Sequence, residues 1–185
     1  MVGFSRYVAL GDSQTEGLWD GDDEAGLFGF ADRLAVMLDE QTPGLRYANL
    51  AVRGNQIRDV LADQLPRALP MRPDLVTVCI GMNDVTRPAP GFGGALACLD
   101  ELYRRLADSG ATVVTTTFPD VARILPVGRV LSARVRRINA TIRTAARRHG
   151  FGLVDLFDHG MRLSGQECES ACRHDDRLGL FAVWH

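Results

Sequence analysis

The chain has 185 residues, of which 46% are hydrophobic and 24% charged, and its formal net charge is −2. This length fits one domain with a buried core, residues 1–185, and the composition lacks the basic excess of a nucleic-acid-binding protein. All 21 basic residues are arginine, which excludes mechanisms that depend on a P-loop or Schiff-base lysine.

The amino terminus carries no sign of a targeting segment. The first predicted strand begins about six residues after Met1, which leaves no room for the charged and apolar regions of a signal peptide. No apolar stretch approaches the ~20 residues that span a bilayer. We therefore expect a cytoplasmic protein with no transmembrane segment.

Short runs of β-forming residues alternate with segments of helical periodicity along the chain. The predicted strands are Tyr7 to Leu10, Tyr47 to Val52, Leu75 to Ile80, Thr112 to Thr117 and Gly152 to Leu156. The predicted helices are Phe28 to Glu40, Ile57 to Leu69, Phe92 to Ser109 and Gly128 to His149. Such alternation indicates a parallel sheet with right-handed crossovers and helices on both faces. We therefore expect an α/β fold, a three-layer α/β/α sandwich around a five-stranded parallel sheet.

The predicted helix Gly128 to His149 has the clearest pattern. Its apolar stripe recurs at helical spacing, at Leu131, Val135, Ile138, Ile142 and Ala145. Its other positions are rich in arginine, at Arg134, Arg136, Arg137, Arg143, Arg147 and Arg148. We interpret these arginines as a solvated face, with anion binding as the alternative.

Small and polar residues follow the first three predicted strands, in Gly11-Asp12-Ser13, Arg53-Gly54-Asn55 and Gly81-Met82-Asn83. The carboxyl ends of parallel strands lie at one edge of a sheet, where open α/β folds bind ligands. Acyl transfer needs a nucleophile and donors aimed at an oxyanion, and a serine hydroxyl, a glycine N–H and an asparagine amide fit these roles. Taken alone, Asp12-Ser13 is equally typical of a helix N-cap.

These three segments resemble the first three sequence blocks of the SGNH, or GDSL, hydrolases. The order and separation match, and the resemblance covers roughly residues 7–156. It implies a flavodoxin-like sheet and a serine esterase with Ser13 as nucleophile. The Ser13 N–H, the Gly54 N–H and the Asn83 side chain would form the oxyanion hole. It also implies a small-molecule or lipid ester as substrate and no metal or organic cofactor.

The fourth block of that family, Asp-x-x-His, is absent from the chain. His174 is our choice for the base, because Gly179 follows it at the family's spacing. The position three residues before it is Ala171 instead of an acid. Glu169 or Glu167 would have to replace that acid.

The other histidines are weaker candidates for the base. His159, just past the fifth predicted strand, is the runner-up. His149 ends a predicted helix and is interpreted as a capping cation, whereas His185 is the last residue and a poor base for that reason. Residues 158–185 depart from the family pattern, and we interpret this tail as an altered or truncated carboxyl terminus.

The missing acid leaves a second hypothesis, that of a catalytically impaired SGNH-like domain which binds an acylated ligand. A third is an unrelated flavodoxin-like nucleotide or flavin binder. The lack of a glycine-rich phosphate loop counts against the third hypothesis.

The cysteines are interpreted as structural. Cys79 and Cys98 lie in apolar patterns and are predicted to be core residues. The spacing of Cys168 and Cys172 permits a local disulfide or half a metal site, but two thiols without a second ligand pair are weak evidence for zinc.

Other residues near the three blocks have two interpretations each. Trp19, Leu27 and Phe28 would line an acyl pocket or belong to the core. Arg87 would contact substrate or mark the turn before Pro88.

Overall fold

The computed structural model describes residues 3–18, 21–22, 26–87, 91–119 and 128–157. The main sheet contains β1 (Arg6–Gly11), β4 (Arg46–Asn49), β5 (Leu75–Cys79), β6 (Thr112–Thr116) and β7 (Gly152–Val154), and β2 (Gly21–Asp22) and β3 (Gly26–Leu27) pair separately. The α-helices are α1 (Ser13–Glu16), α2 (Phe30–Gln41), α3 (Ile57–Asp59), α4 (Leu65–Ala68), α5 (Met82–Thr86), α6 (Phe92–Ala107) and α7 (Gly128–His149). A π-helical turn, η1 (Val60–Gln64), joins α3 to α4, and a 3-10 turn, η2 (Leu69–Met71), follows α4.

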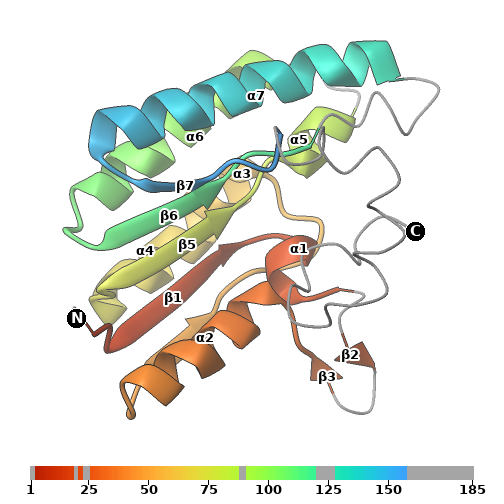
Figure 1. Cartoon of the computed structure of the whole chain (residues 1–185). Coiled ribbons are helices and arrows are strands. Elements are labelled where there is room, and N and C mark those ends of the chain that lie inside the picture. The colour runs from red at the N-terminus through yellow and green to blue at the C-terminus, as the bar shows by residue number, and fades with distance from the viewer. Residues whose placement is uncertain (1–2, 19–20, 23–25, 88–90, 120–127, 158–185) are drawn as a thin grey trace.

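The five strands of the main sheet are parallel and lie in the order β4-β1-β5-β6-β7. In Figure 1, α2 lies on one side of this sheet and α6 and α7 lie on the other. The helical segment α3–α4 contacts α6 and therefore belongs to the second layer. The predicted α/β/α sandwich with a five-stranded parallel sheet is confirmed.

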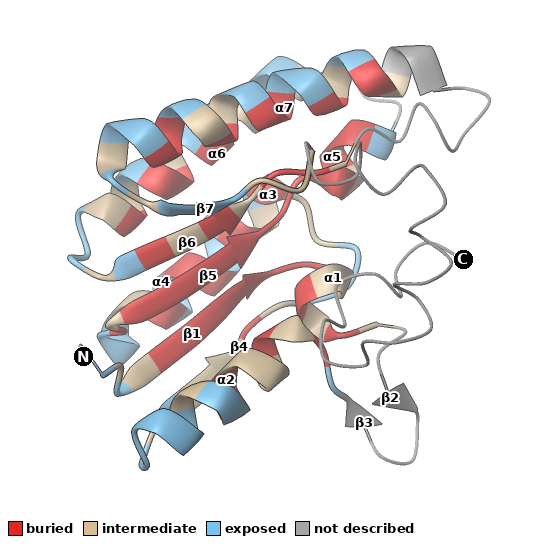
Figure 2. Cartoon of the chain, in the orientation of Figure 1, coloured by how far each residue is buried: buried red, intermediate tan, exposed pale blue. Residues whose placement is uncertain are grey.

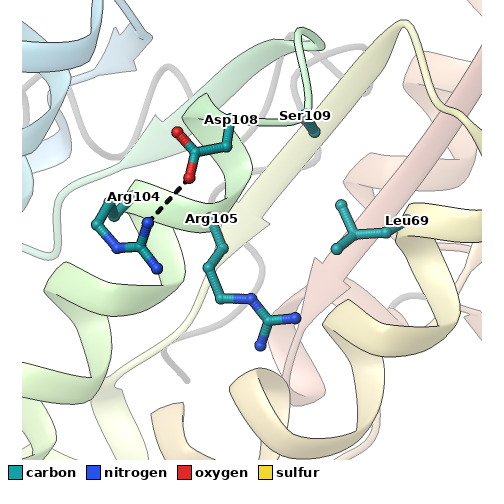
Figure 3. Close-up of a pocket in the computed structure, with 5 residues that line it drawn as sticks. All are labelled: Leu69, Arg104, Arg105, Asp108 and Ser109. Atoms are coloured by element: carbon teal, nitrogen blue, oxygen red, sulfur yellow. Dashed lines mark hydrogen bonds and ion pairs between the residues drawn. The ribbon is translucent and has the colours of Figure 1, made fainter.

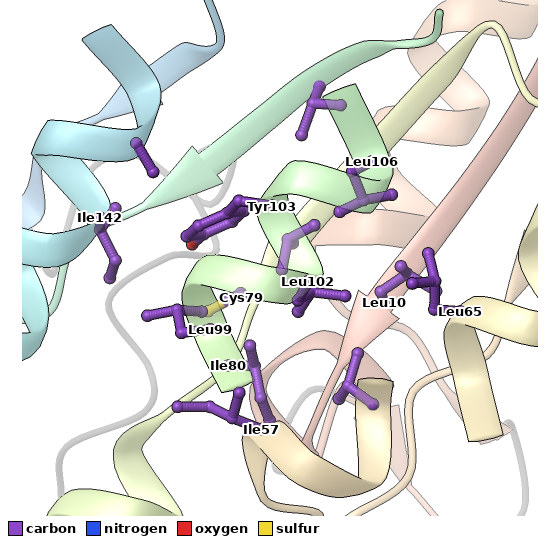
Figure 4. Close-up of a cluster of buried hydrophobic side chains, with 14 of the residues drawn as sticks. Leu10, Ile57, Leu65, Cys79, Ile80, Leu99, Leu102, Tyr103, Leu106 and Ile142 are labelled. Carbon is purple, nitrogen blue, oxygen red and sulfur yellow. The ribbon is translucent and has the colours of Figure 1, made fainter. Parts of the chain in front are cut away.

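Each face of the sheet buries its own apolar cluster. The larger cluster lies between the sheet and α3, α4, α6 and α7, and Figure 4 shows Leu99, Leu102 and Tyr103 of α6 among its members. The smaller one includes Tyr7 and Ala35 under α2. Figure 2 shows β1 and β5, the central strands, as the most continuously buried.

The apolar stripe predicted for α7 faces the core. Val135, Ile138, Ile142 and Ala145 are buried, and Leu131 is partly buried against them. Cys79 is buried, which confirms it as a core residue, whereas Cys98 is only partly buried and packs against the same cluster. None of the helices in the described ranges is long and apolar enough to cross a membrane.

The arginine face of α7 is only partly solvated. The guanidinium of Arg134 donates to the carbonyls of Val85 and Arg87, at 3.1 and 2.9 Å. Arg143 forms a two-point ion pair with Asp155, at 2.6 and 2.8 Å. These contacts tie α7 to the segments that follow β5 and β7, so the prediction of a wholly solvated face is wrong for these two residues.

The predicted helix Ile57 to Leu69 is not one regular α-helix. The Leu65 N–H donates to the carbonyl of Val60, which makes the turn before α4 a π-turn. Pro66 explains this break, because proline has no N–H to donate and its ring crowds the carbonyl four residues earlier.

Candidate active site

Ser13 lies at the surface where β1 ends and α1 begins. Asp12 is the N-cap, and its carboxylate accepts from the Gln14 N–H at 3.2 Å. Asp12 is buried whereas Ser13 is half-buried. Because the Asp12 carboxylate caps α1, the Ser13 hydroxyl is not needed for capping. Neither that hydroxyl nor the Ser13 N–H is hydrogen-bonded to another described residue.

Gly11 permits the tight turn that brings α1 against the sheet. A side chain on this residue would collide with the Thr15 hydroxyl and the Cys79 carbonyl. The Thr15 hydroxyl donates to that same carbonyl at 3.4 Å. Only glycine at position 11 therefore allows the chain between β1 and Ser13 to lie this close to β5.

The segment after β4 is held against α1. The Asn49 side chain donates to the Thr15 carbonyl at 2.8 Å and accepts from the Ala51 N–H at 3.1 Å. Gly54 then turns with φ of +78°, a conformation that favours glycine. The Gly54 N–H makes no hydrogen bond to a described residue.

Asn83 joins all three predicted segments. It is the second residue of α5, and its side-chain amide donates to the Asn55 carbonyl at 2.9 Å and to the Asp12 carboxylate at 3.3 Å. Figure 1 shows α1 and α5 at the same end of the sheet, where the strand arrows point. The structure therefore brings Ser13, Gly54 and Asn83 to one edge.

Two buried carboxylates lie beneath this edge. Burial raises the pKa of Asp12 to about 6, and the nearby charge of Asp84 adds to that rise. Burial also raises the pKa of Asp84, although its carboxylate accepts from the Ile57 N–H at 3.0 Å. Ionised Asp12 is an acceptor for the Asn83 amide, so its charge state bears on how that amide is held.

Charged side chains surround Gly54. Arg53 pairs with Glu16 of α1 at 3.0 Å. The Arg87 guanidinium donates to the Gly54 carbonyl at 3.3 Å. Arg87 thus contacts the peptide beside a candidate oxyanion donor, and it does more than mark a turn.

The aromatic residues predicted to lie near Ser13 are only partly described. Phe28 is 43% exposed, and the Arg33 guanidinium lies over its ring at 5.4 Å from the ring centre. Phe28 is therefore not a core residue, and it also lies outside α2, which begins at Phe30. Trp19 and the side chain of Leu27 fall outside the described part of the chain.

The predicted base lies outside the described residues. This applies to His174, to the runner-up His159 and to His185, and equally to Glu167, Glu169, Ala171, Cys168 and Cys172. His149, the one histidine among the described residues, ends α7 and stacks on Phe151 at 5.4 Å. The end of α7 is at the opposite edge of the sheet from Ser13 (Figure 1). No described histidine therefore lies at the candidate site.

A pocket of about 270 Å³ lies elsewhere on the molecule (Figure 3). Its lining includes Leu69 of η2 and Arg105 and Asp108 near the end of α6. The end of α6 leads into β6 at the amino edge of the sheet, opposite the candidate site. Within the described ranges, no cluster of three or more His, Cys, Asp or Glu side chains could hold a metal ion.

Gln64 was not among the predicted site residues, although its buried carboxamide makes two hydrogen bonds to Gly11. It accepts from the Gly11 N–H at 2.9 Å and donates to the Gly11 carbonyl at 2.8 Å. One signal could have pointed to it. Gln64 lies four residues after Val60 and four before Ala68, both core residues, so it is a polar side chain in an apolar stripe.

The chain is similar to known proteins in sequence and in fold. A family model described as the GDSL-like Lipase/Acylhydrolase family matches residues 9–178. No curated protein matches the chain. Among solved structures, LAE5, an alpha/beta hydrolase enzyme from the metagenome of Lake Arreo in Spain, is 27% identical with a TM-score of 0.69, covering 87% of this chain and 81% of its own.

Two other solved structures are similar in fold. Axe2, an acetylxylan esterase from Geobacillus stearothermophilus, is 20% identical with a TM-score of 0.68, covering 87% of this chain and 80% of its own. An extracellular lipase from Streptomyces rimosus is 23% identical with a TM-score of 0.62, covering 83% of this chain and 81% of its own.

Proposed function

The chain belongs to the GDSL-like lipase/acylhydrolase family, a family of ester hydrolases, and from this premise we propose that it hydrolyses carboxylic esters through an acyl-enzyme on Ser13. The observation that carries the proposal is the meeting of Ser13 and Asn83 through Asp12, with the Ser13 hydroxyl and N–H both unpaired among the described residues. Acyl transfer requires a nucleophilic hydroxyl, a base to take its proton and donors that can bind the oxyanion. The Ser13 hydroxyl and the N–H groups of Ser13 and Gly54 are not engaged by other described residues.

In the proposed first step, the Ser13 oxygen attacks the ester carbonyl carbon and its proton passes to a base, which we assign to His174. The negative charge on the former carbonyl oxygen is stabilised by the Ser13 N–H, the Gly54 N–H and the Asn83 amide. The tetrahedral intermediate then collapses, and the alcohol leaves with the proton from the base. Water attacks the acyl-serine by the same route and releases the carboxylic acid and free Ser13.

Asn83 must redirect one hydrogen to act in this way. Its two amide hydrogens are directed to the Asn55 carbonyl and the Asp12 carboxylate. The bond to Asp12, at 3.3 Å, is the longer of the two. We infer that the oxyanion takes the place of Asp12 as acceptor, while the bond to Asn55 keeps the side chain oriented.

The substrate is proposed to be a small-molecule or lipid ester. Support comes from the fold neighbours, which include an acetylxylan esterase and an extracellular lipase. Acetyl, butyryl and palmitoyl esters of one chromogenic alcohol separate these two possibilities. Acetylated xylo-oligosaccharides should be assayed beside this series. They keep the acetyl group and vary the alcohol.

The proposal is tested by mixing purified protein with an activated acetyl ester, following the released alcohol and locating the acyl group by mass spectrometry. We expect a burst with the acyl group on Ser13, followed by turnover, and no activity in Ser13→Ala. Ser109→Ala is the matched control, because Ser109 is an exposed serine in the turn before β6, at the opposite edge. Adduct without turnover, or neither, would favour the impaired-domain hypothesis.

A further inference from the structure

The Gln64 side chain binds Gly11, which lies two residues before Ser13. Its carboxamide is fully buried and closes on the peptide groups of Gly11, accepting from the N–H at 2.9 Å and donating to the carbonyl at 2.8 Å. Gly11 is the last residue of β1 and lies two residues before Ser13. The Gly11 carbonyl also accepts from the Val52 N–H at 3.3 Å, so the same peptide connects to the segment that carries Gly54.

The π-turn has a direct bearing on this contact. Gln64 is the last residue of η1, directly before Leu65 and Pro66. A π-turn accommodates one extra residue and so changes which way the following side chains point. Regular α-helical geometry here would place the Gln64 side chain differently relative to Gly11. Single π-turns within helices occur frequently at functional sites, which agrees with this placement.

Gln64 is not accessible to an ester substrate. It is buried, and its polar atoms are both used by Gly11. We propose that Gln64 is a positioning residue, which holds the Gly11 peptide so that the Ser13 hydroxyl and N–H face the same reacting carbonyl. This inference rests on the proposed esterase function of the site.

The chain contains a matched control for this contact. Asn139 of α7 is also fully buried and grips Phe118 in the same way, accepting from its N–H at 2.9 Å and donating to its carbonyl at 2.7 Å. Phe118 follows β6, and no residue of the proposed mechanism lies in that segment. Loss of either carboxamide removes two buried hydrogen bonds of nearly equal length, but only Gln64 acts on the chain leading to Ser13.

The test compares Gln64→Leu with Asn139→Leu on an activated acetyl ester at a temperature where both are folded by circular dichroism. For Gln64→Leu we expect kcat to fall about 10- to 100-fold with KM unchanged, because misplaced reacting groups weaken only the transition state. Asn139→Leu should keep its kcat while losing thermal stability to a similar extent. Equal kcat values in both variants would refute the positioning role.

Gln64→Glu gives a second readout that a purely structural role would not produce. A protonated glutamic acid offers the one donor and one acceptor that Gly11 needs, whereas the ionised form offers acceptors only. Burial favours the neutral form of a carboxyl group. The ratio of kcat in Gln64→Glu to kcat in the wild type should therefore rise as pH falls. A ratio that is independent of pH would contradict the inference.

Amide hydrogen exchange separates this inference from the esterase proposal. Gln64→Leu should lose protection in the peptide spanning residues 7–18, and Asn139→Leu should not. If the wild type neither forms an acyl adduct nor turns over, the esterase proposal fails and the exchange result still decides about Gln64. Unchanged protection at residues 7–18 in Gln64→Leu would then refute the positioning role.

Discussion

Asn83→Asp is the most informative substitution at the candidate site. It keeps the shape of the side chain but replaces the NH₂ group by an oxygen. That oxygen would face the Asn55 carbonyl and the Asp12 carboxylate, which now accept hydrogen bonds at 2.9 and 3.3 Å. Both contacts would turn from donor–acceptor into acceptor–acceptor pairs, and the proposed oxyanion donor would be lost.

The size of the effect follows from these two contacts. Removing one oxyanion donor lowers kcat by about 10²–10³-fold in a serine hydrolase. Leaving a buried acceptor unsatisfied costs about 1–3 kcal/mol. Two fully buried acceptors that lose their donor would cost about 2–6 kcal/mol. Because both contacts of Asn83 are only partly buried, we expect Asn83→Asp to destabilise the fold by the lower part of this range, about 2–4 kcal/mol. The new carboxylate should also raise the pKa of Asp12 further, since like charges at this distance oppose ionisation.

Steady-state kinetics on a chromogenic acetyl ester and urea unfolding measure the two effects separately. KM should stay unchanged, because the lost interaction forms only in the transition state. Asn83→Ala, which removes the donor without adding a charge, should lose as much kcat and less stability than Asn83→Asp. Asn139→Asp is the control for a buried carboxamide that bonds to Phe118, and Phe118 has no role in the proposed mechanism. Wild-type kcat in Asn83→Asp would refute the assignment of Asn83 to the oxyanion.

Three further outcomes are expected. The pKa of Asp12 rises from 3.8 to about 6 on folding, so the contribution of this carboxyl to stability should fall by about 3 kcal/mol as pH rises through that interval, at about 1.4 kcal/mol per pKa unit. In urea unfolding, the stability of the wild type relative to Asp12→Asn should therefore decline by that amount. Gly54→Ala has room for its methyl group but strains a φ of +78°, so thermal unfolding should show a loss of about 1 kcal/mol, and kcat should fall because the N–H moves. Arg143→Met should cost about 1–3 kcal/mol at neutral pH; since Arg143 lowers the pKa of Asp155, the difference from wild type should decrease as unfolding is measured at progressively more acidic pH, because protonation of Asp155 removes the ion pair.

The fold could be predicted because its signals are local. Short apolar runs predict β1 and β5, and the spacing of apolar residues predicts the buried face of α7. Each of these patterns is visible in the local sequence. Right-handed crossovers then place the ends of the parallel strands at one edge. For this reason Ser13, Gly54 and Asn83 could be brought together from their positions in the sequence alone.

The details that were missed depend on contacts between distant segments. The bond of Asn83 to Asp12 spans 71 residues of sequence, and that of Gln64 to Gly11 spans 53. Neither bond can be predicted from periodicity, because each depends on how segments distant in the sequence pack against each other. The π-turn was not predicted either, because apolar periodicity does not show where a single helical turn takes up one extra residue.

The buried polar groups under the candidate site lower the stability of the fold at this edge of the sheet. Asp12 is buried with a raised pKa and lies near a second buried carboxylate, Asp84. An asparagine at position 12 would still cap α1 without carrying a charge. The ionised carboxylate, however, is a stronger acceptor for the Asn83 amide than a neutral group. Enzymes generally give up stability at a functional site in return for a fixed geometry. Here the ionised Asp12 orients the Asn83 amide until, as we propose, the oxyanion replaces it as acceptor.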